Sequence, residues 1–284
     1  MGFFDLSFSN LSAELKQADN RGIHNFCLGT LEAYFRVNEV HAVYDEGVLV
    51  ISGLAGAART KVFVFEPRLD QPGRIDTLLN LQRQAVIYSI APLPLAKKSR
   101  FKECAYDLAD VFDPASYPNA RKRSKRLSQP FTRLSTRGVE LRQLSISDRP
   151  AVLELHNAWR DWKLSNPKTM QIMFPKARYL RCADVGLANP ENYVVFGAWQ
   201  GERLLGVRVL YLESRHAFDL ANFTAVWQTY SNFAEDFNIA TMLLLEQKSI
   251  GRLNCGATLS ADLSAFKSHW PHKYVESFAY GRIR

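Results

Sequence analysis

The spacing of hydrophobic and polar positions changes several times along the first half of the chain. Residues 9–38 carry apolar side chains at three- and four-residue intervals, which predicts two helices separated by Gly22. Residues 41–67 instead hold two β-rich runs around an Asp45-Glu46-Gly47 turn, which predicts a β-hairpin. Residues 74–92 predict a helix that leads into a short apolar strand.

The second half repeats this order. Residues 139–146 predict a strand, and residues 147–166 predict a helix with Ser147 or Asp148 at its N-cap and Pro150 in its first turn. The remaining predicted elements are strands within 193–221 around a Gln200-Gly201 turn, a long amphipathic helix over 231–251, a short helix over 261–271 and a terminal strand over 274–284.

Alternating helices and strands are typical of an α/β or α+β fold. The two halves follow one plan, and either a structural duplication or a chance similarity of pattern explains it. On the first interpretation the chain has an N-terminal domain at residues 1–115, a basic connecting segment at 116–137 and a C-terminal domain at 138–284.

Composition and charge narrow the classes of partner. The chain has 284 residues, of which 47% are hydrophobic, and this is enough for a sizeable core. Its net charge of +8 favours nucleic acid, anionic membrane or anionic small-molecule partners, unless the charge serves solubility alone. The four cysteines form no CxxC pair and no metal motif, and no apolar run reaches the roughly 18 residues that a membrane span needs. We therefore expect reduced thiols, no bound metal and a cytoplasmic location.

A cluster of positive charge lies inside the basic connecting segment. On a helix, four of its residues would share one face and repel one another, and a bound polyanion would offset that repulsion. A solvated linker and a localisation signal are the alternatives. The cluster consists of Arg121, Lys122, Arg123, Lys125 and Arg126.

The order of elements in the second half is similar to the N-acetyltransferase-like (GNAT) fold, whose central hairpin looks like residues 194–212 here. The basic cluster and residues 253–280 narrow this resemblance. They resemble the family that contains the C-terminal domain of phosphatidylglycerol lysyltransferases and is related to the Fem-type peptidoglycan aminoacyltransferases. The resemblance implies two tandem GNAT-like domains, with mixed, mainly antiparallel sheets flanked by helices. Besides the basic cluster, the matching positions are Gly256, Leu263, Phe266 and Lys267.

The sequence departs from acetyl-CoA-dependent GNAT enzymes at one place. Those enzymes hold the cofactor's pyrophosphate on a glycine-rich loop at a helix N-terminus. The corresponding stretch here, residues 222–237, contains no glycine, and the near match at 252–257 follows a helix rather than opening one. Acetyl-CoA is therefore disfavoured as the donor, and the resemblance implies aminoacyl-tRNA.

Acyl transfer needs a neutral nucleophile and a stabilised oxyanion. By the family match, Lys267 is a candidate cation for a carboxylate, a phosphate or the oxyanion, and a helix-terminal lysine is the alternative. Asp236 and Glu213 are candidate bases, and Tyr230 and Tyr274 are candidate proton donors.

The helix at 147–166 carries further candidates for substrate binding. Trp159, Trp162 and Lys163 combine aromatic rings with a cation, a pattern that suits stacking on bases, and a tryptophan packed in the core is the alternative. Gly256 and Phe266 join them as predicted binding residues through the family match.

These expectations combine into three readings. The first is an acyltransferase that moves an aminoacyl group from a tRNA-type donor to an amine or hydroxyl acceptor. The second keeps the chemistry and makes nucleic acid the acceptor, as in bacteriophage DNA base hypermodification. The third is a non-catalytic nucleic-acid-binding module on a GNAT scaffold.

Overall fold

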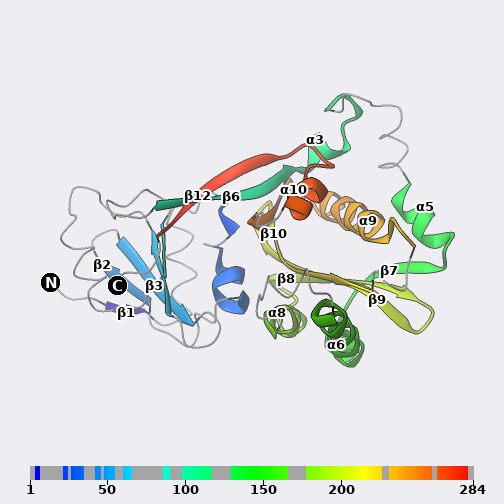
Figure 1. Cartoon of the computed structure of the whole chain (residues 1–284), viewed down its shortest axis with the longest axis horizontal. Coiled ribbons are helices and arrows are strands. Elements are labelled where there is room, and N and C mark those ends of the chain that lie inside the picture. Colours follow the sequence, from blue (N-terminus) through cyan, green and yellow to red (C-terminus); the bar gives the residue numbers. More distant parts are fainter. Residues whose placement is uncertain are drawn as a thin grey trace. The chain divides into compact units, whose positions relative to one another are not determined.

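The architecture comes from a computed structural model of the whole chain (Figure 1). The residues that the structure describes are 4–6, 22–24, 27–34, 42–45, 48–54, 60–65, 86–89, 98–116, 129–165, 177–225, 230–257 and 261–280. Contacts divide the chain into two units that interleave along the sequence. Unit 1 comprises Met1–Cys104, Gly256–Ser264 and Tyr274–Arg284, and unit 2 comprises Ala105–Cys255 and Ala265–Lys273.

Unit 1 contains a mixed, mainly antiparallel sheet. Its strands follow the order β1-β2-β3-β4-β5-β12, in which only β4 and β5 pair in parallel. Asp45 pairs with Val48 in the β2–β3 hairpin, as the acidic turn predicts. The bounds are β1 Phe4–Leu6, β2 Ala42–Asp45, β3 Val48–Leu54, β4 Thr60–Phe65, β5 Val86–Ser89 and β12 Lys273–Tyr280, with a short π-helix, η2, at Thr30–Tyr34.

Unit 2 contains a five-strand run in the order β7-β8-β9-β10-β11, antiparallel except for the β10–β11 pair. Gly201, at a φ of 58°, makes the β8–β9 turn that the sequence predicts. The strands are β7 Val139–Gln143, β8 Tyr193–Gln200, β9 Arg203–Glu213, β10 His216–Thr224 and β11 Arg252–Ala257. The last two residues of β11 belong to unit 1.

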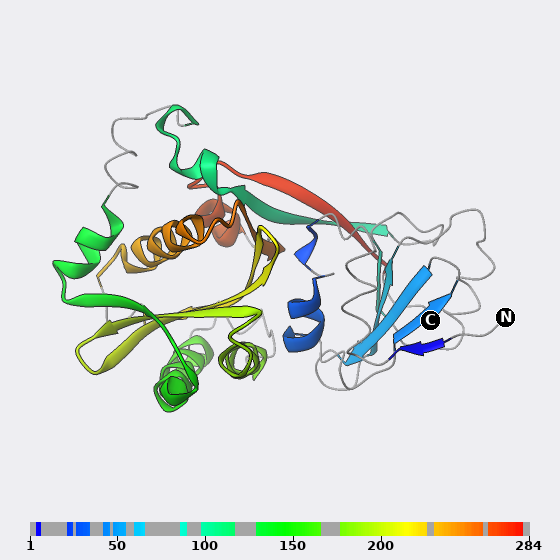
Figure 2. The same cartoon turned by 180° about the vertical axis from the view of Figure 1, so that it is seen from behind.

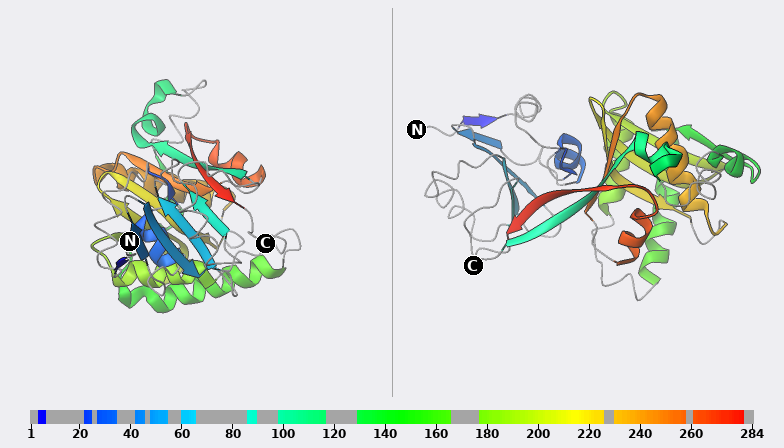
Figure 3. Two further views of the ribbon diagram at one scale, coloured as in Figure 1. Left: turned by 90° about the vertical axis from the view of Figure 1, so that its left-hand side faces the viewer. Right: turned by 90° about the horizontal axis from the view of Figure 1, so that it is seen from above.

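Helices cover both faces of the unit 2 sheet. The helices α6 (Arg149–Ser165) and α8 (Ala177–Ala188) pack on one face, and α9 (Phe233–Gln247) lies on the other (Figure 1, Figure 2). The left-hand view of Figure 3 also shows α6 and α8 together on a single face. This two-sided cover explains why β8 and β9 are buried almost without interruption instead of alternating.

The remaining helices and strand are short or divided between the units. Helix α5 (Pro130–Ser135) packs on α9 and on β7. The others are β6 Lys98–Asp107, α3 Leu108–Phe112, the 3₁₀ turns η4 Pro114–Ser116 and η5 Ile146–Asp148, and α10 Ala261–Lys267.

The helix ends differ in detail from the sequence-based expectation. Ser145, not Ser147, forms the capping box with Asp148, because the 3₁₀ turn η5 precedes α6. Helix α9 begins after Asn232, as predicted, but ends at Gln247, before the predicted stop at Gly251. Ser249 adopts the left-handed φ of 62° instead.

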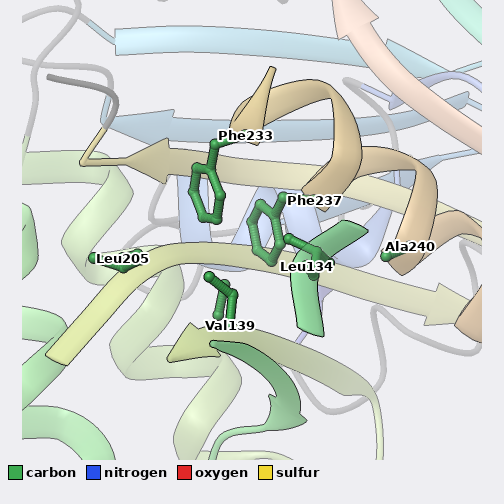
Figure 4. Packing of buried hydrophobic residues seen from close by; sticks show 7 residues of the cluster. Leu134, Val139, Leu205, Phe233, Phe237 and Ala240 are labelled. Atoms are coloured by element: carbon green, nitrogen blue, oxygen red, sulfur yellow. The ribbon is translucent and has the colours of Figure 1, made fainter. Parts of the chain in front are cut away.

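A buried cluster holds α5 against the N-terminal half of α9 and the sheet. Figure 4 shows Phe233 and Phe237, one helical turn apart, facing Leu134 of α5 and Leu205 of β9. The two phenylalanine rings stack with their centroids 5.9 Å apart. This cluster therefore fixes the last part of the basic connecting segment, which contains Leu134, and the start of β7. Its members are Leu134, Val139, Ala198, Leu205, Phe233, Phe237 and Ala240.

The structure confirms the predicted class, a mixed and mainly antiparallel sheet flanked by helices. The predicted repetition is confirmed in part, because each unit has a mixed sheet, but flanking helices on both faces are described only for unit 2. The helices expected within 9–21 and 74–82 lie outside the described residues. The domain ranges 1–115, 116–137 and 138–284 stay predictions.

Candidate functional site

Strands β10 and β11 separate inside unit 2. They pair in parallel over His216–Phe218 and Arg252–Asn254, and both strands continue beyond this pairing. The next residues on the two strands are Asp219 and Cys255. The pairing of β10 with β9 shifts register between Asp219 and Ala221, so an irregularity coincides with the separation. Bulges of this kind often lie beside active sites, where they redirect a side chain.

Three side chains meet at this point, Arg208, Asp219 and Cys255. Together with Lys267, which bonds to the Cys255 carbonyl, we call them the strand-separation cluster. The Arg208 guanidinium donates from Nε and Nη2 to Asp219 Oδ2, at 3.0 and 2.8 Å. The Cys255 Sγ lies 3.8 Å from Arg208 Nη2 and 3.9 Å from Asp219 Oδ2. An arginine, a carboxylate and a thiol are thus in contact at the separation of the strands.

Arg208 also bonds to the helix above the sheet. Its Nη1 donates to the Asn238 carbonyl at 3.2 Å and to Thr241 Oγ1 at 2.6 Å, both on α9. The side chain is fully buried. Burial alone would lower the pKa of Arg208, but the contacts with Asp219 raise it overall, so the guanidinium stays charged. One side chain of β9 therefore ties β10, β11 and α9 together.

Lys267, the candidate cation of the sequence analysis, lies beside the same strand. It is only 7% exposed, and its Nζ donates to the Cys255 carbonyl at 2.7 Å. Its own carbonyl accepts from Tyr106 Oη at 2.8 Å. The ring of Phe266 packs edge-on against Trp270, and Trp270 packs edge-on against Tyr106. Phe266 therefore belongs to the packing that holds Lys267 in place.

Gly256 has a conformational reason to be glycine. Its φ is +66°, and a Cβ at this position would lie 3.3 Å from the His24 ring. The predicted near match to a phosphate-binding loop at 252–257 is the strand β11, so it does not open a helix. The family match at Gly256 is thus explained by backbone geometry and close packing.

A second polar group, the α9 N-terminal cluster, comprises Arg133, Arg137, Tyr230 and Asp236. The buried Asp236 carboxylate accepts from Arg133 Nε and Nη2 on Oδ1, both at 2.7 Å, and from Tyr230 Oη on Oδ2 at 2.9 Å. Burial and the bond to Asp236 raise the pKa of Tyr230, so its hydroxyl stays protonated. The structure therefore brings the predicted catalytic residues Tyr230 and Asp236 together, and it joins them by a hydrogen bond to each other.

The other predicted residues lie apart from these clusters. Trp159, on α6, is buried against Tyr179 and Phe223, on the face of the sheet opposite α9. Trp162 is half-buried, and the Lys163 ammonium lies 4.8 Å from its ring centroid. In addition, Glu213 ends β9, and Tyr274 is exposed in unit 1. The basic residues Arg121, Lys122, Arg123, Lys125 and Arg126 lie outside the described residues.

The sequence analysis missed Arg208 and Asp219. A single charged residue inside the apolar run of β9 was the one available signal for Arg208, because a buried arginine needs a partner. The described residues contain no group of three His, Cys, Asp or Glu side chains that could hold a metal ion. In the same part of the chain, no helix is both long and apolar enough to span a membrane.

Comparison with known proteins identifies the fold. No protein-family model and no curated protein sequence matches the chain. Among solved structures, FemX matches with a TM-score of 0.60 at 10% identity, covering 100% of this chain and 98% of its own. The C-terminal domain of a putative lysylphosphatidylglycerol synthetase from Agrobacterium fabrum matches with a TM-score of 0.56 at 14% identity, covering 94% and 92%.

A third structure, a conserved protein of unknown function from Bacteroides thetaiotaomicron, matches with a TM-score of 0.69 at 11% identity over 98% of this chain and 99% of its own. At such low identity these matches report on the fold alone. They include the two groups of proteins that the sequence resembles. The chain therefore has the GNAT-like fold that the sequence predicts.

Proposed function

We propose that this chain is an acyltransferase that moves an aminoacyl group from a tRNA-type donor to an amine or hydroxyl acceptor. The observation that carries the proposal is the fold likeness along nearly the whole chain to FemX and to a putative lysylphosphatidylglycerol synthetase domain. The name of the putative lysylphosphatidylglycerol synthetase describes a lysylated phospholipid as the product of that protein. A shared fold alone does not assign chemistry, so the site supplies the rest of the argument.

The reaction needs no group beyond donor and acceptor. The neutral amine or hydroxyl attacks the ester carbonyl of the donor, and the carbon–oxygen bond to the tRNA ribose breaks. The attacking group loses one proton and the leaving ribose oxygen gains one, so atoms and charge balance. A fixed cation near the tetrahedral intermediate would stabilise its oxyanion.

Lys267 is the residue that we propose for this electrostatic role. Its ammonium is held by a carbonyl of β11 at the separation of two parallel strands, and it is almost fully buried. A cation in a site from which water is excluded acts more strongly than one in bulk water. Arg208 is fully engaged with Asp219 and α9, and we assign it to holding the site.

The start of α9 supports a donor other than acetyl-CoA. Its first turn carries Glu235 and Asp236, and the Asp236 carboxylate is already paired with Arg133. A pyrophosphate at this helix end would meet two carboxylates instead of bare N–H groups. We therefore place the phosphate-bearing donor on the basic cluster, Arg121 to Arg126, whose lysines and arginines would contact phosphates without reading sequence.

The test is an intact-mass measurement of candidate acceptors, with DNA among them, after incubation with aminoacyl-tRNA, free amino acids or acyl-CoA. We expect one acceptor to gain the mass of an aminoacyl residue, and only with aminoacyl-tRNA. In Lys267→Met the product should fall by about 10²–10³-fold, whereas the exposed Lys248→Met should match wild type.

The same experiment separates the other functions. A mass gain on DNA would support transfer to nucleic acid, and a gain from acyl-CoA would contradict the tRNA donor. Salt-dependent binding to nucleic acid without any product would support the non-catalytic module and contradict the proposed transferase.

A further inference from the structure

Arg137 is an exposed residue whose backbone is fixed on both sides. It lies in the turn between α5 and β7, where its N–H donates to the Leu134 carbonyl at 3.0 Å. Its carbonyl accepts from Gln200 Nε2 at 2.8 Å. The guanidinium lies over the Tyr230 ring, 4.0 Å from its centroid. A long side chain at the surface is therefore held in one direction from both of its ends.

Tyr230 is itself held in place. Its hydroxyl donates to Asp236, and Asp236 accepts from Arg133. In this chain of contacts the charges of Arg133 and Asp236 compensate each other. Among the described residues, no carboxylate lies within ion-pair distance of the Arg137 guanidinium. Within the described part of the chain, Arg137 is therefore a surface cation without a carboxylate partner.

Arg137 is the last residue of the basic connecting segment. The described chain resumes at Gln129, three residues after Arg126, and α5 is packed on α9 through the buried Leu134. Arg137 ends this short anchored stretch. The structure thus fixes one cation within the described part of the basic connecting segment.

We infer that Arg137 is a phosphate contact for a nucleic-acid backbone. In this arrangement Tyr230 and Asp236 are positioning residues, because the Tyr230 ring lies under the Arg137 guanidinium and Asp236 accepts from the Tyr230 hydroxyl. The inference rests on the proposed function, in which the donor or the acceptor is a nucleic acid. A guanidinium suits phosphodiester oxygens because it can donate two parallel hydrogen bonds.

Unit 2 contains a matched control for this arginine. Arg142 is also exposed, and its guanidinium also lies over an aromatic ring, 4.4 Å from the centroid of Trp199. It differs in charge compensation, because its Nη2 lies 3.1 Å from Asp148 Oδ1. Substituting Arg142, five residues further along the chain in β7, removes the same chemical group without removing an uncompensated charge.

The experiment measures the affinity of the full chain for deacylated tRNA over a series of salt concentrations. We expect Arg137→Ala to weaken binding on the order of tenfold at low salt. The slope of log affinity against log salt should fall by about 0.7–0.9, the value for one lost phosphate contact. Arg142→Ala should leave both quantities at the wild-type value.

Two variants of Tyr230 test its positioning role. Tyr230→Ala removes the ring under the guanidinium and should lower the salt slope as Arg137→Ala does. Tyr230→Phe keeps the ring and should retain the wild-type slope. A role in folding alone would change the thermal midpoint of these variants without moving the slope.

The outcomes separate this inference from the proposed function. If wild type does not bind tRNA, or if reversing the charges of Arg121, Lys122 and Arg126 leaves its affinity unchanged, the nucleic-acid anchor itself is wrong. If that reversal abolishes binding while Arg137→Ala keeps the wild-type slope, only the assignment of Arg137 is wrong. A third outcome would overturn the choice of nucleic acid. In it, wild type binds phosphatidylglycerol vesicles but not tRNA, and Arg137→Ala loses the vesicle binding.

Discussion

The two polar clusters that contact α9 each pair an arginine with an aspartate, but the charged groups differ in their exposure to solvent. In the strand-separation cluster Arg208 is fully buried, and its partner Asp219 is 11% exposed. In the α9 N-terminal cluster the exposure is reversed, because Asp236 is 3% exposed and Arg133 is 31% exposed. The first ion pair is buried, whereas the second has one partner in contact with water.

This difference suggests a division of labour. A buried ion pair adds little net stability compared with a hydrophobic pair of the same shape, so its presence at the separation of β10 and β11 is best explained by the geometry that it imposes. The partly exposed pair costs less, and it leaves Tyr230 oriented toward Arg137. We infer that the strand-separation cluster shapes the site of chemistry and that the α9 N-terminal cluster orients Arg137, the proposed phosphate contact.

The largest expected effect on stability is at the buried pair, Arg208 and Asp219. Asp219→Asn should destabilise the fold by about 3–5 kcal/mol, because it leaves the Arg208 charge buried without its partner. Chemical denaturation of the full chain, followed through the fluorescence of the tryptophans in unit 2, gives the free energy of unfolding. A loss below about 1 kcal/mol would show that water reaches Arg208 and that the pair is not closed.

The matched substitution in the other cluster should have a smaller effect. In Asp236→Asn the Arg133 charge stays in contact with water, and the asparagine oxygen still accepts from Tyr230. We expect a loss of about 1.5 kcal/mol, the lower end of the range for a hydrogen bond to a charged group. The comparison between the clusters fails if Asp236→Asn proves as destabilising as Asp219→Asn under the same denaturant.

Thiol labelling tests whether the strand-separation cluster can be reached from solvent. Cys255 is half-buried, whereas Cys27, Cys104 and Cys182 are buried. Burial also raises the pKa of Cys182 to about 12, so its thiolate is scarce at pH 8. Native protein treated with iodoacetamide should gain one label, at Cys255. Peptide mapping that found no label, or a first label elsewhere, would mean that small molecules do not reach this cluster.

The smallest effect is expected at the paired end of the same strands, at His216. Burial, and then the positive charge of Arg252, lower its pKa. The folded state therefore binds this proton less readily than the unfolded state, and stability should fall as the pH drops below about 6.5 toward the folded-state pKa. His216→Gln should flatten this part of the stability profile. An unchanged profile in that variant would assign the loss to other groups.

Local pattern predicts the parts of this fold that local interactions determine. The Gln200-Gly201 turn, the start of α9 after Asn232 and the helix that carries Lys267 all depend on neighbours in the sequence. The strand-separation cluster does not, because Arg208, Asp219 and Cys255 come from three strands and meet only once β10 and β11 are placed. Sequence alone could not give Cys255 a positively charged neighbour for the same reason.

The α9 N-terminal cluster shows the opposite kind of limit. Residue type makes Asp236 a candidate base and Tyr230 a candidate proton donor, but it does not show that they bond to each other. The position of the basic cluster before α5 was readable, but the role of Arg133 as the partner of Asp236 depends on how α5 packs against α9.

The central claim is that Lys267 acts on the chemical step and Arg137 acts on donor binding. The most direct test is the rate of aminoacyl transfer to the acceptor that gains mass, measured against aminoacyl-tRNA concentration for wild type, Lys267→Met and Arg137→Ala. We predict a fall in kcat with little change in KM for Lys267→Met, and a rise in KM with kcat retained for Arg137→Ala. The opposite assignment, or equal effects on both constants in both variants, would contradict the account.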